Sequence, residues 1–259
     1  MKRAIGLAWL TVSELSAHEQ VSLAAEAGYS HVGLRLLPVA NQILPPFDER
    51  ETGWRLASSG IQVLDVEVFR LAPQTRISDF ESTLAVAGRL GASQLLVHGD
   101  DPEEQRLIET FGGLCELAGR YGLAANIEPM PWVHISTVAK ARRILGGAGR
   151  TNAGLLVDPI HFFRADNRFD ELQGVSANYL QFCDAPAERP GDMQEVIRQA
   201  RSDRLFPGEG GLDLNGLLRA LPADLPISIE IPHAKPMSAL ERAKRALAAT
   251  RKLLLPRVA

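Results

Sequence analysis

The sequence has little of several features that mark particular classes of protein. Its 259 residues include two cysteines, Cys115 and Cys183, and six histidines, and the formal net charge is −3. The cysteines lack the spacing of a metal site or a disulfide framework, so we expect both to be reduced and buried, as in a cytoplasmic protein. Without a basic excess, the sequence argues against nucleic acid or an anionic membrane as a partner.

The sequence also lacks an apolar run long enough to span a membrane. The N-terminal apolar stretch, residues 4–10, is short for the core of a secretion signal, and the polar residues Ser13, Glu14 and His18 soon follow. We therefore expect a first β-strand there rather than a signal peptide. What the sequence does contain is 46% hydrophobic residues, enough to bury the core of one large domain or two small ones.

Strand-like and helix-like patterns alternate along the whole sequence. Apolar, β-branched runs typical of buried strands begin near Ile5, His31, Ile61, Ser93, Ala124, Gly154, Tyr179 and Ile227. Helical patterns occupy residues 17–27, 48–59, 77–90, 102–121, 137–145, 169–175, 214–221 and 239–255. Successive strands recur at intervals of roughly thirty residues, the size of one βα unit. An insertion at about residues 186–211 interrupts this spacing before the last strand.

Eight such units predict a single (β/α)8 TIM barrel, with residues 1–259 forming one domain. The alternative is a doubly wound open sheet, which usually carries a glycine fingerprint after its first strand. Here the first strand is followed by Thr11-Val12-Ser13-Glu14, with no glycine-rich loop. The sequence shows no linker and no low-complexity tract that would divide it into domains.

Four oxygen-bearing side chains lie at or near the ends of four successive predicted strands: Glu128, Asp158, Gln181 and Glu230. In a (β/α)8 barrel, the C-terminal ends of the strands meet at one mouth and form the active site. Any one of these residues alone could be a helix cap or a salt-bridge partner. Several buried carboxylates together, however, need compensating positive charge. We therefore predict that the four side chains bind one divalent metal ion.

Other residues near predicted strand ends are candidates for substrate contact. His161 follows Asp158 by three residues, and its ordinary pKa near neutrality suits a general base or a substrate-binding group; a surface histidine is the alternative. His98, Arg35, Arg164 and Trp132 are candidate substrate-binding residues. The arginines could bind an anionic group, and the tryptophan could pack against a sugar-like ring.

Each of these candidates also has an ordinary structural interpretation. His98 could be a hydrogen-bonded core histidine, Arg164 could be solvated, and Trp132 could simply pack. Near the end of the third strand, Glu67 and Arg70 could form an ion pair. The glycine-rich segment 207–211 could bind phosphate, or it could be a turn into a helix capped by Asp213.

Five short segments, taken in order, resemble the sugar isomerase/epimerase family with the xylose-isomerase-like barrel. They are Ile127-Glu128-Pro129, Val157-Asp158-Pro159-Ile160-His161, Leu180-Gln181-Phe182-Cys183-Asp184, Pro207-Gly208-Glu209-Gly210 and Ile229-Glu230-Ile231. The resemblance implies that Glu128, Asp158 and Glu230 are metal ligands and that the two glutamates are also the catalytic acid/base groups. The fourth ligand of that family is usually histidine. The neutral oxygen donor of Gln181 favours Mg²⁺ or Mn²⁺ over Zn²⁺.

The same ligand set also resembles the 3-dehydroshikimate dehydratase branch of this family. That branch often has a second histidine two residues after the first glutamate, where this sequence has Met130. The resemblance implies a metal-dependent isomerase or epimerase that acts on a small polyhydroxy ketone or aldehyde through an enediolate. The alternative is a metal-dependent dehydratase, a lyase, with His161 as the base.

Two further classes share the barrel or its shape. An abasic-site endonuclease needs a histidine-rich zinc cluster, against which six histidines and a net charge of −3 argue. A non-catalytic binding barrel would not need the complete ligand set seen here. The expected partner is therefore a small polyhydroxy or keto substrate in carbohydrate metabolism, and the sequence is also compatible with a homo-oligomer.

Overall fold

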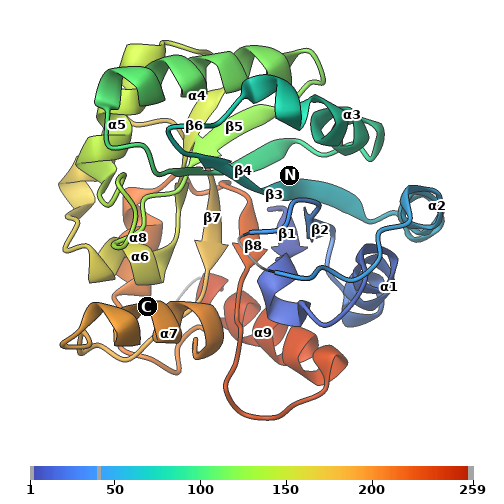
Figure 1. The fold of residues 1–259 in the computed structure, drawn as a ribbon. Coiled ribbons are helices and arrows are strands. Elements are labelled where there is room, and N and C mark those ends of the chain that lie inside the picture. Colours follow the sequence, from blue (N-terminus) through green and yellow to red (C-terminus); the bar gives the residue numbers. More distant parts are fainter. Residues whose placement is uncertain (1–2, 40–41, 256–259) are drawn as a thin grey trace.

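Eight parallel strands close into a barrel in the computed structural model, which describes residues 3–39 and 42–255 (Figure 1). The strands are β1 (Ile5–Leu7), β2 (His31–Arg35), β3 (Gln62–Leu71), β4 (Gln94–Gly99), β5 (Ala124–Ile127), β6 (Ala153–Val157), β7 (Ala177–Phe182) and β8 (Ile227–Ile229). Each strand pairs with the next along the chain, and β8 pairs with β1. The predicted (β/α)8 barrel is confirmed, and the doubly wound open sheet is wrong.

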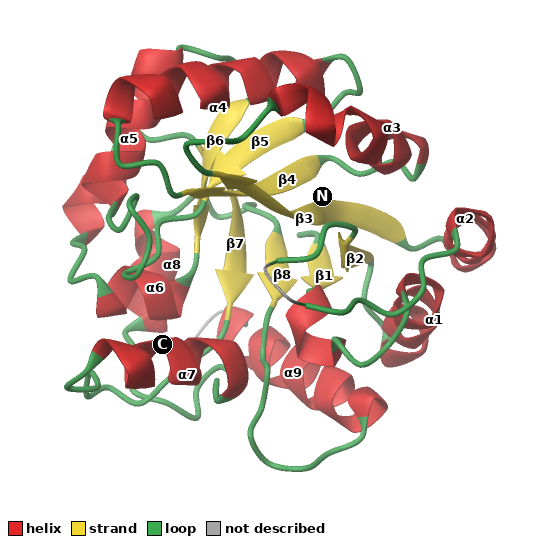
Figure 2. Ribbon diagram, viewed as in Figure 1, coloured by secondary structure: helices red, strands yellow, loops and turns green. Residues whose placement is uncertain are grey.

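Helices surround the barrel on its outside (Figure 2). The α-helices are α1 (Ala17–Ala27), α2 (Glu49–Ser59), α3 (Glu81–Arg89), α4 (Glu104–Gly119), α5 (Val138–Ala148), α6 (Pro159–Arg164), α7 (Met193–Ser202), α8 (Leu214–Ala220) and α9 (Ala239–Leu254). Short 3-10 helices are η1 (Trp9–Val12), η2 (Ile77–Phe80) and η3 (Phe169–Leu172). Within the described ranges, no helix combines the length and apolar character that crossing a membrane requires.

Helices α6 and α7 form where the sequence pattern did not predict them. In α6, Asp158 is the N-cap and its side chain accepts a hydrogen bond from the backbone of Ile160, while Pro159 takes the first helical position. Both are favoured choices at a helix start. In α7, Asp192 caps the helix, and Val196 and Ala200 form part of its buried face. Part of the insertion before β8 is therefore an ordered helix that borders the barrel mouth.

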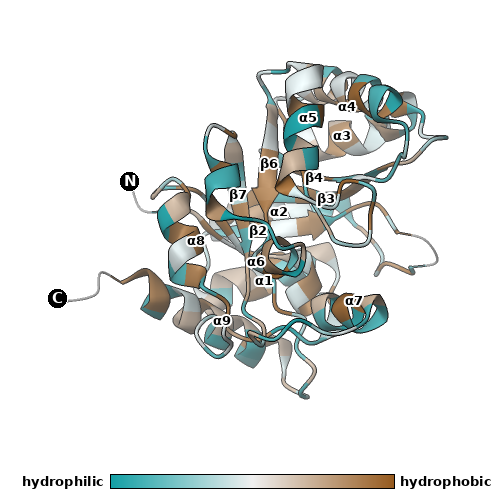
Figure 3. Ribbon diagram, turned by 90° about the vertical axis from the view of Figure 1, so that its left-hand side faces the viewer, coloured by the Kyte–Doolittle hydropathy of each residue, from teal (hydrophilic) through white to brown (hydrophobic). Residues whose placement is uncertain are grey.

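The hydrophobic core has two parts on either side of the strands. The larger part fills the space between the barrel and its helices. The smaller part lies inside the barrel and consists of Leu64, Val68, Leu96, Leu156 and Tyr179. Hydropathy colouring shows apolar residues along the central strands and hydrophilic residues on α5 and α7 (Figure 3). The inner cluster closes the barrel below its mouth, so the strand ends form the floor of a site.

The pairing of β2 with β3 positions an acidic residue at the mouth. The register shifts after Val32, so that Gly33 pairs with Asp65 and Arg35 pairs with Glu67. A Cβ atom on Gly33 would lie 2.6 Å from Oδ1 of Asp65, closer than two such atoms can approach. The absence of a side chain at residue 33 therefore allows the carboxyl group of Asp65 to lie inside the barrel, one layer below Glu67.

Candidate functional site

A cavity of about 200 Å³ opens at the C-terminal ends of the strands. Most of the residues predicted for the site line it: Arg35, His98, Glu128, Trp132, His161, Gln181 and Glu230. Asp158 does not line the cavity; it is buried beside it, with its carboxylate 3.7 Å from Nε2 of the lining residue His161. The structure thus brings the predicted strand-end residues to one place, as parallel strands of a closed barrel require.

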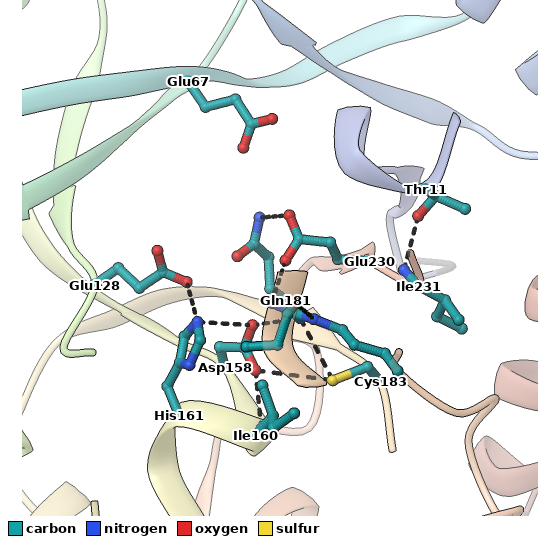
Figure 4. A network of polar contacts seen from close by, with 12 residues as sticks. Thr11, Glu67, Glu128, Asp158, Ile160, His161, Gln181, Cys183, Glu230 and Ile231 are labelled. Carbon is teal, nitrogen blue, oxygen red and sulfur yellow. Dashed lines mark hydrogen bonds and ion pairs between the residues drawn. The ribbon is translucent and has the colours of Figure 1, made fainter. Parts of the chain in front are cut away.

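Glu128, Asp158 and His161 converge most closely. Their ligand atoms all lie within 4.8 Å of one another. Nε2 of His161 is 3.8 Å from Oε1 of Glu128 and 3.7 Å from Oδ2 of Asp158. Figure 4 shows the three side chains pointing toward one another, with Gln181 and Glu230 beside them. The amide of Gln181 donates a hydrogen bond of 3.1 Å to Oε1 of Glu230.

The local chain explains how these side chains reach the mouth. Glu128 directly follows β5, Glu230 directly follows β8, and Gln181 lies within β7. Asp158 follows β6 and accepts a hydrogen bond of 2.9 Å from the backbone of Ile160. This cap starts α6, which places His161 beside Asp158 within the first helical turn. The same carboxylate therefore starts the helix and contributes to the site.

Arg204 connects two of the carboxylates and was not predicted from the sequence. Its Nη1 atom is 2.6 Å from Oδ2 of Asp158, and its Nη2 atom is 2.7 Å from Oε2 of Glu230. A further bond of 2.6 Å runs from Nε to the carbonyl of Ala200. The side chain is buried, so the guanidinium supplies positive charge within the carboxylate cluster. A buried arginine that bridges two carboxylates in this way holds both in fixed orientations.

Burial and neighbouring charges shift the pKa values of the acidic residues in different directions. Burial, followed by the repulsion of Asp158, raises the pKa of Glu128 well above its ordinary value. Burial also raises the pKa of Glu230, to about 8, although Arg204 opposes the shift. For Asp158, burial would raise the pKa, but Arg204, His161 and its hydrogen bonds together lower it. At neutral pH, Asp158 is therefore the firmly ionised member of the cluster, and the two glutamates favour their protonated forms until a cation compensates them.

The two histidines of the site are neutral. Burial is the main cause that lowers the pKa of His98 and of His161, in each case to about 3. His98 Nε2 and Oε2 of Glu128 share a hydrogen bond of 2.9 Å. His161 packs edge-on against the ring of Trp132, with 4.9 Å between the ring centroids. A neutral imidazole can accept a proton, but a pKa of about 3 makes His161 a weak base near neutrality.

Another acid, Asp65, lies beneath this cluster. It is 1% exposed, and both of its carboxyl oxygens lack a hydrogen-bond partner among the described residues. Burial, followed by the charges of Glu67, Glu230 and Glu128, raises its pKa well above the ordinary value. The barrel interior therefore favours the protonated form of Asp65. The residue lies in the middle of β3, and its place in an apolar run is the sequence signal that could have identified it.

The candidate substrate-binding residues divide into two groups. Arg35 lines the cavity, where its guanidinium lies 4.0 Å above the ring of Trp9 and 3.4 Å from Oε1 of Glu67. His98 and Trp132 also line it. Arg164, in contrast, does not belong to the cavity wall, because its guanidinium binds the side chain of Gln199 and ties α6 to α7.

Two alternatives left open by the sequence are settled by the contacts. Arg70 forms an ion pair with Asp100, so the Glu67–Arg70 pair is wrong. The segment 207–211 is a turn: the carboxylate of Asp184 accepts hydrogen bonds from the backbone of Gly208 at 2.9 Å and of Gly210 at 3.0 Å. These N–H groups are therefore engaged within the protein and do not form a phosphate-binding loop.

The residues at the mouth fit a divalent cation. Carboxylate oxygens, an amide oxygen and an imidazole are suitable donors, and several of them converge within a few ångströms. Oε1 of Glu128 is buried and has no hydrogen-bond partner among the described residues, so it is free to bind a cation. A bound cation would also compensate the carboxylate repulsion that raises the pKa of Glu128.

Comparison with known proteins identifies the family. Residues 21–253 match the xylose isomerase-like TIM barrel family, and the chain belongs to that family. A crystal structure of an IolI protein with a bound zinc atom superposes with a TM-score of 0.80, covering 97% of this chain and 98% of that one at 18% identity. At that identity the likeness shows the fold alone.

Two relatives have described activities. The chain is 30% identical over 136 residues to a 3-dehydroshikimate dehydratase of Pseudomonas aeruginosa, a match covering 50% of this chain and 21% of the relative. It is 25% identical over 157 residues to an inosose isomerase of Bacillus velezensis, covering 56% of this chain and 54% of the relative. The chain thus matches about a fifth of the first relative's length and about half of the second's. The similar proteins therefore include both an isomerase and a dehydratase, the two activities considered from the sequence.

Proposed function

We propose that this protein is a divalent-metal-dependent isomerase or epimerase that acts on a small polyhydroxy ketone or aldehyde. The observation that carries the proposal is the cluster at the mouth of a (β/α)8 barrel, where ligand atoms of Glu128, Asp158 and His161 lie within 4.8 Å of one another and Gln181 and Glu230 lie beside them (Figure 4). The family supports an enzyme of this class, and the inosose isomerase relative supports a carbonyl-bearing polyol as substrate.

Glu128, Asp158, Gln181 and Glu230 would hold the metal ion, and the hard oxygen donors favour Mn²⁺ or Mg²⁺. When bound, such an ion polarises a substrate carbonyl and stabilises the negative charge that forms on its oxygen. Glu128 and Glu230, whose pKa values burial raises, would gain a compensating positive charge from an ion held at this site.

The chain's own residues would move the proton. Glu128 and Glu230 follow different strands, β5 and β8, and so approach a substrate in the cavity from different sides. One carboxylate can remove the proton next to the carbonyl, and the other can return a proton to the opposite face. Burial holds the pKa of Glu230 at about 8, which suits a group that both gives and takes a proton near neutrality. Trp132 packs edge-on against His161 on that side of the cavity.

A dehydratase remains the second candidate, favoured by Gln181 and by the relative that is 30% identical. Here His161 would remove the proton and the substrate would lose water instead of receiving a proton back. His161 lines the cavity in its neutral form, but its pKa of about 3 makes it a weak base near neutrality, which counts against this candidate. Met130 lines the cavity where the dehydratase branch often has a second histidine, which supports the isomerase reading.

The two candidates make different products. The Mn²⁺-loaded protein is incubated in D₂O with ketohexoses, with an inosose and with 3-dehydroshikimate. An isomerase or epimerase exchanges the proton next to the carbonyl of a sugar-like substrate, which NMR detects. A dehydratase converts 3-dehydroshikimate into an aromatic product with new ultraviolet absorbance. The absence of both signals would refute proton abstraction at this site.

Glu230→Gln tests the proton-transfer role within the same assay. The amide keeps an oxygen donor but cannot accept or release a proton near neutral pH. We expect turnover to fall by about 10²- to 10⁴-fold, with the melting temperature kept close to that of the wild type. Near-normal turnover by this folded variant would remove Glu230 from proton transfer.

A further inference from the structure

The cavity wall contains an unusual number of guanidinium groups for a site that faces a cluster of carboxylates. Four arginines line it: Arg35, Arg70, Arg201 and Arg204. Three of them have acidic partners, in the pairs Arg35–Glu67, Arg70–Asp100 and Arg204 with both Asp158 and Glu230. Arg201 has neither an ion pair nor a side-chain hydrogen bond to any residue in the described ranges.

Arg201 is held over the cavity by an aromatic ring. It lies in the last turn of α7, and its guanidinium carbon is 5.9 Å from the ring centroid of Trp132. Trp132 in turn packs against His161, so the three side chains form a layer along one wall. A guanidinium that packs on an aromatic face keeps its N–H edges free, and that edge matches a carboxylate in a bidentate contact.

Arg201 lines the same cavity as His98, His161 and Glu128, and its side chain is itself exposed to solvent. A substrate that reaches the metal ligands would pass within its range.

The formal charges of the site point the same way. Four arginines in the wall face four carboxylates in the wall, Glu67, Asp100, Glu128 and Glu230. These charges cancel, and Asp158, which lies beside the cavity, adds one negative charge. A divalent cation would change the formal sum from −1 to +1. Once loaded with metal, the site is therefore balanced by a substrate with one negative charge. This step depends on the metal in the proposed function.

We propose that Arg201 binds a carboxylate of the substrate, so that the substrate is a polyhydroxy keto acid rather than a neutral sugar. The proposal deepens the proposed function and rests on it for the reacting end of the substrate. A carboxylate is favoured over a phosphate because the site offers one unpaired guanidinium, and the nearby glycine N–H groups of residues 208 and 210 already bind Asp184. A phosphate dianion would find too few donors.

The test uses a probe that cannot react. Quinate is a cyclic polyhydroxy carboxylate without a carbonyl beside a removable proton, and its neutral primary amide has the same ring. Calorimetry measures the affinity of the Mn²⁺-loaded protein for both, in the wild type and in Arg201→Gln, with Arg201→Lys as the charge-retaining variant. Arg198→Gln is the matched control, since Arg198 lies on the same helix and pairs with Glu195 and Asp203.

We expect the wild type to bind quinate at least about tenfold more tightly than the amide, the effect of one charge-assisted contact. Arg201→Gln should abolish this preference, Arg201→Lys should keep part of it, and Arg198→Gln should leave it unchanged. The proposal is overturned if the wild type shows no carboxylate preference, if quinate fails to bind at millimolar concentration, or if Arg201→Gln keeps the preference. Tighter Arg201-dependent binding of glycerol 3-phosphate than of quinate would overturn the carboxylate assignment in favour of phosphate.

Failure of this inference is distinguishable from failure of the proposed function. Quinate binding needs no turnover, whereas proton exchange with neutral ketoses needs no carboxylate. Proton exchange with neutral ketoses together with an absent carboxylate preference would leave the enzyme class standing and remove the role of Arg201. A carboxylate preference that depends on Arg201, without proton exchange on any substrate, would keep the role of Arg201 and remove the proposed enzyme class.

Discussion

Replacing Arg204 with methionine should destabilise the metal-free protein more than any exposed arginine does. Arg204 is 2% exposed, and its guanidinium contacts Asp158 and Glu230 at 2.6 and 2.7 Å. Without it, two buried carboxyl groups lose the positive charge nearest to them. Removing one partner of a buried ion pair typically costs about 3–5 kcal/mol. Methionine fills much of the volume, so the loss reports charge rather than a cavity.

The assay is thermal unfolding of the wild type and the variant in the presence of chelator. For a chain of this size, about 1 kcal/mol shifts the melting temperature by roughly 2–4 °C, so a decrease on the order of 10 °C is expected. Adding Mn²⁺ should narrow the difference between variant and wild type, because a bound cation supplies positive charge to the same carboxylates. Arg198→Met is the control, since its exposed ion pairs contribute about 1 kcal/mol or less.

Two outcomes would refute this reasoning. The first is a melting temperature for Arg204→Met within about 2 °C of the wild type in chelator, equivalent to less than about 1 kcal/mol. The guanidinium would then not be the charge that holds Asp158 and Glu230 together. The second is a loss as large for Arg198→Met, which would show that burial of the guanidinium is not the cause.

Two further predictions follow from the pKa shifts. Burial raises the pKa of Glu230 to about 8, so the folded state keeps a proton that the unfolded state releases. The contribution of this proton to the free energy of unfolding is present at low pH and is lost as the pH rises through about 8. Between about pH 7 and 9, where His98 and His161 are largely neutral in both the folded and the unfolded state, the metal-free protein should lose at least about 1 kcal/mol of unfolding free energy in urea titrations, and Mn²⁺ should reduce the slope; a flat profile in chelator would contradict it. Burial raises the pKa of Cys115 to about 12 and also raises that of Cys183. Both thiols should therefore resist a disulfide reagent at pH 8 until the chain unfolds, and rapid reaction in the native state would contradict their burial.

The fold was predictable because its pattern is local and repeated. Each βα unit has an apolar run, an amphipathic helix and a turn, and β1 begins at the predicted residue. Helices α6 and α7 escaped because the first is only six residues long and the second lies in a polar insertion. The capping residues Asp158 and Asp192 were the available signals.

The site was predictable only in so far as it follows from strand ends. Glu128, Asp158, Gln181 and Glu230 are brought together because parallel strands in a closed barrel end at one mouth. Contacts between side chains on neighbouring strands could not be predicted, because they depend on the strand register. Arg35 lies opposite Glu67 only because the register of β2 and β3 shifts.

Residues that reach the mouth from the insertion were missed for a different reason. Arg201 and Arg204 lie at the end of α7 and just beyond it, and one becomes exposed while the other is fully buried. Arginines three residues apart look alike in a sequence. Only the packing of α7 against the barrel decides which guanidinium enters the carboxylate cluster and which one stays over Trp132.

The most direct test of the account is the position of a bound metal ion. A crystal of the Mn²⁺-loaded protein, measured for anomalous scattering at the manganese edge, should show one strong peak per chain among Glu128, Asp158, Gln181 and Glu230. The ion should lie within about 2.5 Å of at least three of their oxygen atoms. No peak at the barrel mouth in a protein that has been loaded with Mn²⁺, or a peak held only by surface carboxylates, would contradict the metal-dependent mechanism.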